Sequence, residues 1–476
     1  MLLEDLELGE CLVVDLLHTA VVQWRPGQRQ EMEHPNQRFM SAKQIVKTHL
    51  AAVLVLVAAV VIVYHNALSA YFFDDDFQWL VTSWSFHPSQ LVAFGSMSHF
   101  YRPVIDVYFA VMTGLLGGSP ALFHAASIGL HIGTVLVVFA LASRIYGPAE
   151  ADAYNSSGSR WSGRSLYGFV TALFFAVQPS DIDAVAWVGA LAETIGALFG
   201  CLSLLWFLQW RDTGRSRLRA LSIAAFGLAL LTHESSVVFF PVLLLTDWII
   251  WRVDKGLPSV ADWRIFAPYV VLIALYLALD LWINSRNYVV SQGYYTFGFH
   301  ILTNALNYIV GLYVGRRDVL NYVVIVAGVI VLLLRGNARV RFATCWMVLA
   351  LAPFLSFNWG NTSRYLYQPA IGFSLLLAEG VMLLNRPRYR PVLAVVVAAI
   401  AIRFAVFANS NVRDFALRTQ VYPEYLTKFR QTHGALPSYA LVEPDPEFAK
   451  LHPHQFANAA VQWAYRDATI QVRPYK

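Results

Sequence analysis

The sequence predicts an all-α polytopic membrane protein, and three observations lead to this fold class. Hydrophobic residues make up 57% of the 476 residues and charged residues 14%, whereas a soluble domain has about 45 to 50% apolar residues. The apolar residues form long runs, and a membrane span needs about 20 of them. The Lys and Arg residues, which give a net charge of +5, lie in short clusters between the runs. Such clusters are typical of topology signals rather than of a nucleic-acid-binding face.

About eleven apolar runs are long enough to be spans, because the flanking residues of a shorter run can reach the interface. In chain order they cover 49–66, 121–144, 165–179, 191–210, 219–232, 236–251, 265–283, 319–335, 342–357, 368–385 and 391–408. We expect them to form one helical bundle.

The basic clusters predict the orientation of the bundle, because Lys and Arg in short loops favour the cytoplasmic side. All of them lie inside if the N-terminus is inside, the C-terminus is outside, and the stretches 104–117 and 301–315 lie along the outer interface. The clusters are 25–47, 144–164, 211–219, 335–341 and 386–390. This topology puts the long first loop, 67–120, on the extracytoplasmic side.

Composition divides the chain into three segments. They are a polar cytoplasmic tail, a transmembrane catalytic domain and a small extracytoplasmic appendage, at 1–48, 49–409 and 410–476. Met40, followed by "SAKQIVK", has the form of a short basic start of a membrane protein. A further hypothesis is therefore that translation begins at Met40 and that residues 1–39 are not translated.

The stretch "YFFDDDFQWL" at 71–80 sets Asp74, Asp75 and Asp76 among aromatic residues just after the first predicted span. Desolvation by aromatic neighbours and repulsion between adjacent carboxylates both raise a carboxyl pKa, which suits a general base acting on a hydroxyl group. Two alternatives stay open here. The acids can mark the point where the helix meets water, or their oxygens can bind a divalent cation.

Two arginines lie on the predicted outer side, whereas Lys and Arg in short loops usually lie on the cytoplasmic side. Arg102 lies in "YRP" and Arg364 in "SRYLY". The planar guanidinium suits phosphate, so both are candidates for binding an anion. The alternative is that each side chain reaches into the outer headgroups.

The sequence has no signal for a metal centre or a nucleotide site. Cys11, Cys201 and Cys345 are far apart, and their spacing fits neither a disulfide framework nor a zinc site. Glycine-rich phosphate-binding loops are also missing from the sequence. We therefore predict no metal centre and no cofactor, and a divalent cation at the three aspartates stays open as an alternative.

Several motifs together resemble a known superfamily. Asn66 followed by "FFDDDF", then "YRP", "QPSDIDAVAW", "THESSVVFFP" and "SRYLYQP", are similar to motifs of the GT-C membrane glycosyltransferases, in the protein O-mannosyltransferase-like branch. The likeness covers about residues 49–408. It implies a GT-C-like bundle and transfer of a sugar from a polyprenyl-phosphate carrier to a hydroxyl of a protein, glycan or lipid, with inversion.

The resemblance also implies roles for individual residues. Asp75 and Asp76, with Asp74 beside them, match the catalytic acids, and Arg102 and Arg364 match the residues that hold the donor phosphate. Candidates for contact with substrate are Tyr101, Asp183, Glu193, Glu234, Tyr365 and Tyr367.

The predicted function is thus that of a multi-pass glycosyltransferase, resembling hexosyl- or mannosyltransferases, with its active site on the non-cytoplasmic face. A bacterial inner membrane is the expected location, or the endoplasmic reticulum in a eukaryote. The alternative function is a transporter or flippase for a charged or lipid-linked solute. Transporters, however, bind at the midplane between repeated halves, whereas here the acids lie at the membrane edge and no halves repeat.

Overall fold

The computed structural model describes most of the chain after the N-terminal tail. The described residues are 42–92, 101–147, 163–254, 262–284, 293–358, 362–446, 448 and 452–474. The hypothesis of a start at Met40 and the position of Cys11 therefore concern residues outside the described ones, as does most of the tail predicted at 1–48.

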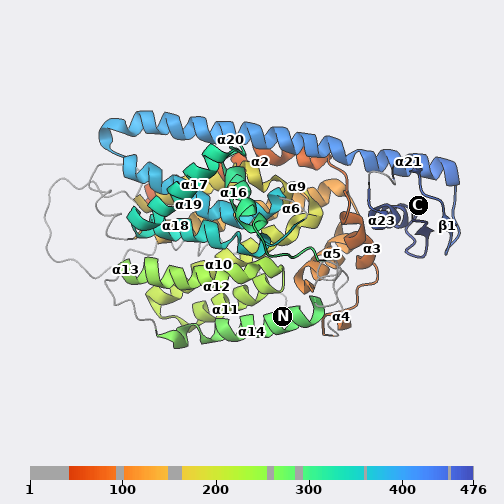
Figure 1. Cartoon of the computed structure of the whole chain (residues 1–476), viewed down its shortest axis with the longest axis horizontal. Helices are drawn as coiled ribbons and strands as arrows, with labels where there is room; N and C mark the ends of the chain where they lie inside the picture. The colour runs from red at the N-terminus through yellow and green to blue at the C-terminus, as the bar shows by residue number, and fades with distance from the viewer. Residues whose placement is uncertain are drawn as a thin grey trace.

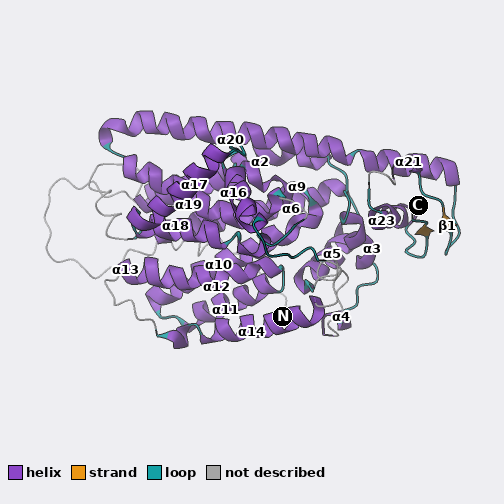
Figure 2. Ribbon diagram, in the orientation of Figure 1, coloured by secondary structure: helices purple, strands orange, loops and turns teal. Residues whose placement is uncertain are grey.

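The described chain is almost entirely helical (Figures 1 and 2). The helices of the main bundle are α2 (Ala42–Tyr64), η1 (His65–Ser69), α6 (Pro120–Ile145), α8 (Gly163–Ala176), η2 (Pro179–Asp181), α9 (Ile182–Ala186), η3 (Val188–Ala190), α10 (Leu191–Thr213), α11 (Ser216–Leu230), η4 (Glu234–Val238), α12 (Phe239–Leu245), η5 (Thr246–Trp251), α13 (Arg252–Asp254), η6 (Trp263–Ile265), α14 (Ala267–Asn284), α16 (His300–Leu312), α17 (Val319–Arg335), α18 (Ala338–Leu349), η7 (Ala352–Phe354), η8 (Ser363–Leu366), α19 (Tyr367–Leu384), η9 (Pro387–Tyr389) and α20 (Arg390–Thr419).

The other elements belong to the first loop and to the C-terminal appendage. The first loop contains α3 (Asp76–Ser83), α4 (Ser89–Val92) and α5 (Pro103–Leu116). The appendage contains α21 (Val421–His433), β1 (Leu441–Val442), α23 (His454–Tyr465) and β2 (Gln471–Val472). The two strands are parallel, with Leu441 opposite Gln471 and Val442 opposite Val472.

Each of the predicted spans overlaps a helix. By length and composition, six helical segments of the described residues can cross a membrane, or seven if α8 and the segment Pro179–Ala186, bent by 48°, count as one span. Three shorter apolar helices are α5, α14 and α17. The chain is therefore a multi-pass membrane protein, whereas the count of about eleven spans stays a prediction. The stretches predicted to lie along the interface are helical too, as α5 and α16.

The described residues form two large hydrophobic cores. The first lies inside the bundle and includes Phe175, Trp346 and Tyr367. The second joins the first loop to the appendage, because Phe72 and Phe77 of the loop pack in one cluster with appendage residues. The first loop and the C-terminal segment, far apart in sequence, thus pack together around one core.

Arg144, Arg211 and Arg339, from three of the basic clusters, lie at one end of the bundle. Arg144 at the end of α6 pairs with Asp212 at 2.9 Å, and Arg211 pairs with Asp247 at 2.9 Å. Arg339 pairs with Glu379 at 2.8 Å and lies 4.7 Å from the ring centre of Tyr146, just beyond the end of α6. These contacts bring the ends of α6, α10, η5, α18 and α19 together, opposite the end from which α10 and α19 begin.

A long helical arm connects the bundle to the appendage. Helix α20 has 30 residues, and α21 follows after Gln420. Figure 1 shows both in blue along one side of the molecule, with α21 reaching the appendage. Helix α20 runs through residues 409 and 410, so the boundary predicted there lies inside a continuous helix.

Candidate functional site

The acid loop, residues 71–76, leads from η1 to the start of α3, and its three carboxyl groups face different partners. Asp74 has a positive φ of 43°, which is unusual for a residue other than glycine. Asp75 precedes the first residue of α3, and Asp76 begins that helix. The backbone turn at Asp74 separates its side chain from the two that follow.

Asp76 is fully buried and ties the acid loop to the bundle. Its Oδ2 accepts the Phe73 N–H at 2.8 Å, and its Oδ1 accepts the Gly189 N–H at 2.5 Å. Burial raises the pKa of Asp76 and the charge on Asp75 raises it further, whereas the two N–H bonds act in the opposite direction. Both carboxylate oxygens are therefore used in holding the backbone.

Gly189 allows the acids to lie against the start of α10. A Cβ at this position would be 2.5 Å from Asp75 Oδ1 and 2.9 Å from Asp76 Oδ1. No side chain fits there without displacing both carboxyl groups.

Asp75 differs from Asp76, because one of its carboxyl oxygens is buried and accepts no hydrogen bond from the described residues. Its Oδ1 has no hydrogen-bond partner among the described residues. Burial raises the pKa of Asp75 to about 6, although Arg364 opposes this increase. A buried carboxylate with a pKa near neutrality and a free oxygen is suited to accept a proton.

Asp74 connects the acid loop to the appendage. Its Oδ1 accepts the Tyr422 hydroxyl at 2.5 Å, and His452 Nδ1 lies 3.2 Å from the same oxygen. Tyr422 belongs to α21 and packs on Phe73 and Phe77 of the acid loop. The appendage thus holds Asp74 in its unusual backbone conformation.

Arg364 lies near the acid loop, and its guanidinium forms no ion pair with a described carboxylate. Its guanidinium carbon is 5.0 Å from the ring centre of Trp187, and its Nη2 donates to the Tyr365 hydroxyl at 3.2 Å. Trp187 in turn donates to the Phe73 carbonyl at 3.4 Å. Within the described residues, no carboxylate lies within 4.0 Å of Arg364. Its fork is therefore available to an anion.

Arg102 is engaged by Glu234. Its Nε and Nη2 donate to the two carboxylate oxygens of Glu234 at 3.0 and 2.6 Å. His233 Nε2 lies 3.9 Å from Glu234 and 3.5 Å from Glu193. An anion that binds to Arg102 must therefore compete with Glu234.

Glu193, at the start of α10, extends this network to α19. Its Oε2 accepts from the Ser235 hydroxyl at 3.2 Å and from Gln368 Nε2 at 3.3 Å. Gln368 lies one turn after Arg364. The starts of α10, η4 and α19 therefore meet in one polar cluster next to the acid loop.

A cavity of about 640 Å³ opens beside this cluster. Asp183 lines it and accepts the Ser363 hydroxyl at 2.5 Å. Its other lining residues are Pro179, Ser180, Ile182, Asn307, Tyr308, Val310, Gly311, Val314, Gly315, Arg317, Thr362, Ser363, Leu366, Phe407, Asn411, Asp414 and Arg418. Ser363 and Leu366 belong to η8, the same short helix as Arg364, so this helix connects the cavity to the arginine.

The three predicted tyrosines lie in different surroundings. Tyr365 joins the site, because it accepts from Arg364 and stacks on Phe354 at 4.2 Å between ring centres. The Tyr101 hydroxyl donates to the Leu91 carbonyl at 3.0 Å. Tyr367 is buried in the bundle core, 2.7 Å from His131 Nδ1. The structure does not bring Tyr101 or Tyr367 into the acid and arginine cluster.

The candidates chosen by sequence leave out several contributors to the site, among them Trp187, Gly189, Ser235, Gln368 and Tyr422. The first four lie in the quoted motifs or beside them. Tyr422 carries no signal, because it is 348 residues from Asp74. The described residues contain no group of three or more His, Cys, Asp or Glu side chains placed to hold a metal ion. The absence of a cofactor stays a prediction.

Comparison with known proteins places this geometry in context. No family model matches the chain. It is 28% identical over 158 residues to the human protein O-mannosyl-transferase TMTC4, and 29% identical over 157 residues to human TMTC1. These alignments cover 32% and 31% of this chain but 21% and 16% of the relatives, so the chain matches about a fifth or less of their length.

Among solved structures, the chain is similar to ArnT from Cupriavidus metallidurans bound to undecaprenyl phosphate, with a TM-score of 0.53 and 13% identity. The superposition covers 92% of this chain and 87% of ArnT, which shows a shared fold. The resemblance predicted from the motifs is therefore confirmed: this is a multi-pass membrane protein with the fold of the GT-C glycosyltransferases and sequence similarity to protein O-mannosyl-transferases.

Proposed function

We propose that the protein is a glycosyltransferase that moves a sugar from a polyprenyl-phosphate carrier to an acceptor hydroxyl on the non-cytoplasmic face. One observation carries the proposal: two unpaired charged groups belong to the same site. The buried Oδ1 of Asp75 has no partner among the described residues, and the guanidinium of Arg364 forms no ion pair with a described carboxylate. One group can accept a proton and the other can hold an anion.

The reaction is a single displacement with inversion. The acceptor oxygen attacks the anomeric carbon, the bond from that carbon to the phosphate oxygen breaks, and the acceptor proton passes to Asp75. The electron pair leaves with the polyprenyl phosphate, whose growing charge Arg364 stabilises. General-base catalysis of this kind contributes about 10²- to 10⁴-fold in rate.

Asp76 and Asp74 act by position in this proposal. Asp76 holds the acid loop to the bundle, because its Oδ1 accepts the Gly189 N–H. Asp74 is held by Tyr422 and His452. Asp75 is therefore the base that we select from the three aspartates.

The cavity lined by Ser363 and Leu366 of η8 supports a lipid-linked donor. Val310, Val314, Leu366 and Phe407 give it apolar surface, and its volume of about 640 Å³ suits the carrier's first units rather than a bare ion. Asp183, at its edge, is placed to contact the sugar. Arg102 joins the phosphate site if the donor displaces Glu234.

The experiment uses the purified full chain and a radiolabelled polyprenyl-phosphate mannose. Mannose is the first sugar to test because the similar proteins are named O-mannosyl-transferases. We expect release of polyprenyl phosphate with membrane extract as the source of acceptor, and no transfer from the same sugar as a nucleotide diphosphate. Asp75→Asn should reduce release at least 100-fold, whereas lipid binding should persist.

The control is a matched pair of arginine variants. Arg364→Gln should weaken retention of the polyprenyl-phosphate sugar at least 10-fold, and Arg388→Gln, an exposed arginine after the far end of α19, should not. Equal retention by both variants would contradict the phosphate site. Movement of the lipid-linked sugar across a vesicle membrane without bond cleavage would favour the transporter or flippase instead.

A further inference from the structure

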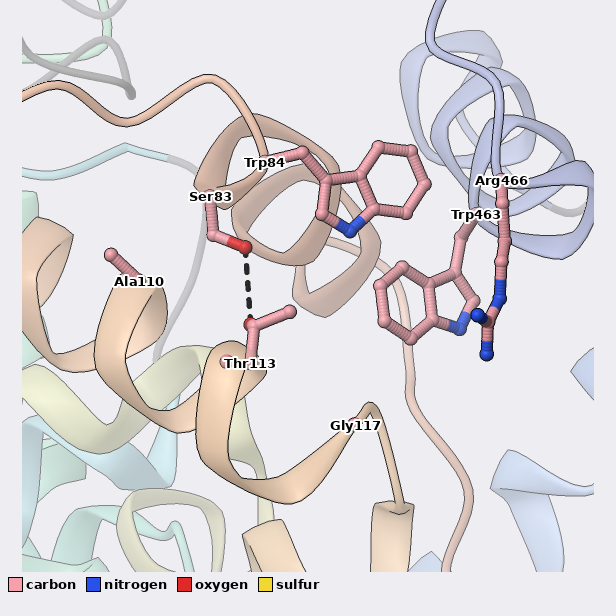
Figure 3. A pocket seen from close by; sticks show the side chains of 8 residues that line it. Ser83, Trp84, Ala110, Thr113, Gly117, Trp463 and Arg466 are labelled. Carbon is pink, nitrogen blue, oxygen red and sulfur yellow. Dashed lines mark hydrogen bonds between the residues drawn. The ribbon is translucent and has the colours of Figure 1, made fainter.

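A second pocket lies between the first loop and the appendage, away from the acids. It has a volume of about 330 Å³ and is formed by α3, α5 and α23. Figure 3 shows the indoles of Trp84 and Trp463 side by side and the Arg466 side chain next to Trp463. The volume is within the usual range for a small-molecule site.

The aromatic wall of the pocket is fixed in place. Trp463 stacks on Trp84 with 5.3 Å between ring centres and an angle of 15°, and it meets Phe72 edge-on at 5.9 Å. Its ring also covers Gly118, whose φ of 80° and missing Cβ allow this contact. A rigid indole surface binds with little loss of side-chain freedom.

The charged wall is a single arginine with an unusual backbone. Arg466 has a positive φ of 53° at the C-terminal end of α23. Its side chain is exposed, and it forms no hydrogen bond or ion pair with the residues that the structure describes. Non-glycine residues in sparsely populated backbone conformations cluster at ligand sites.

Hydroxyl groups complete the lining. Thr113 Oγ1 accepts from the Ser83 hydroxyl at 3.0 Å. Its own proton has no acceptor among the described side chains and backbone. Thr113 can therefore donate a hydrogen bond into the pocket.

The pocket stands at the far end of the helix that begins with the acids. Helix α3 has eight residues from Asp76 to Ser83, so its two ends are about 12 Å apart. The pocket and Asp75 are thus separated by about the length of one or two sugar units. Phe72, which touches Trp463, belongs to the acid loop itself.

We propose that this pocket is an acceptor subsite for a sugar unit that carries a carboxylate or another anionic group. The C–H face of a pyranose packs on an indole, the guanidinium fork pairs with the anion, and Thr113 donates to a ring hydroxyl. A neutral sugar leaves Arg466 unpaired, and a small anion leaves the indoles uncovered. The inference rests on the proposed glycosyl transfer and adds the chemical class of the acceptor.

The test measures binding by the purified full chain with ligand-observed NMR, without any donor. Methyl β-D-glucuronide should bind saturably, and methyl β-D-glucoside and glycerol 1-phosphate at least 10-fold more weakly. Arg466→Gly removes the side chain but suits the positive φ, and it should weaken glucuronide binding at least 10-fold. Arg466→Lys should retain part of the affinity, and Trp84→Leu should lose most of it.

The matched control is Arg473→Gln, an exposed arginine of the same appendage that pairs with Glu443. Glucuronide binding that is unchanged in Arg466→Gly, or equally lowered in Arg473→Gln, would overturn the inference. So would equal binding of glycerol 1-phosphate or of an aspartyl peptide, because either result makes the ring contact unnecessary. Because Asp75→Asn leaves this pocket intact, failure of transfer with retained glucuronide binding would contradict the proposed function alone.

Discussion

Asp75 and Asp76 are adjacent in sequence but have opposite surroundings. Asp76 uses both oxygens to accept N–H groups, whereas Asp75 Oδ1 has no partner among the described residues. The sequence predicts that the acids matter as a group, yet it cannot rank them. Their ranking depends on Gly189, which approaches from a segment more than a hundred residues away.

Asp76→Asn should destabilise the protein. In the asparagine variant, the side-chain NH2 group faces one of the two backbone N–H groups that donate to Asp76 in the unmodified protein. That backbone N–H is then buried without an acceptor, at a cost of about 1–3 kcal/mol. Thermal unfolding measures the loss. Asp75→Asn is the control, and it should unfold close to the unmodified protein. Greater destabilisation by Asp75→Asn would contradict the assignment of these roles.

The pH profile of transfer should report Asp75. A base must be ionised, so kcat/KM should be constant at high pH and fall as the pH drops through about 6, the pKa of Asp75. Arg364 lowers that pKa, so Arg364→Gln should move the midpoint to higher pH. Kinetics across pH 4 to 8 test this, with Arg388→Gln as control. A midpoint near 4, or a shift in the other direction, would exclude Asp75 as the base.

At the scale of elements, the appendage supports the acid loop. Helix α21 supplies Tyr422, whose hydroxyl donates to Asp74 at 2.5 Å. This contact could not be predicted, because nothing in residues 410–476 signals which of their side chains meets the first loop. The helices of the membrane part, in contrast, could be located from their apolar runs, since burial and span length leave a strong local pattern.

Tyr422→Phe should loosen the acid loop. The change removes the donor that faces Asp74 and leaves a partly buried carboxylate with His452 as its neighbour, at a cost of about 1–3 kcal/mol. We expect a lower unfolding temperature and a reduced kcat with little change in KM. Tyr465→Phe is the matched control, because its hydroxyl donates to the Gly434 carbonyl in an exposed contact. Equal effects of the two variants would argue against a role of the Tyr422–Asp74 hydrogen bond in holding the acid loop.

Over the whole molecule, basic residues and the acid loop lie at opposite ends of the bundle. Arg144, Arg211 and Arg339, from three of the basic clusters, lie where α10 and α19 finish, and the acid loop lies where these helices begin. Composition was sufficient to predict the membrane fold class, because 57% hydrophobic residues cannot be accommodated in a soluble domain of this kind. The number of spans could not be fixed in the same way, since α5, α14 and α17 are apolar but short.

Accessibility labelling should find the two ends on different sides of the membrane. In a chain with Cys11, Cys201 and Cys345 replaced by Ala, single cysteines at the exposed positions Ser85 and Tyr439 should react with an impermeant maleimide from the outside. Cysteines at the exposed Arg217 and Arg388 should react after permeabilisation. Labelling of Ser85→Cys and Arg388→Cys from the same side would disprove this topology.

The bare backbone at Gly189 limits how the protein can diverge. A methyl group there would occupy the space of the Asp75 and Asp76 oxygens, so drift at this position is incompatible with the paired acids even when every aspartate is retained. By the proposed mechanism, a homologue that keeps the three aspartates but carries alanine in place of this glycine is a pseudoenzyme. Genome surveys can use position 189 to separate such copies from active ones.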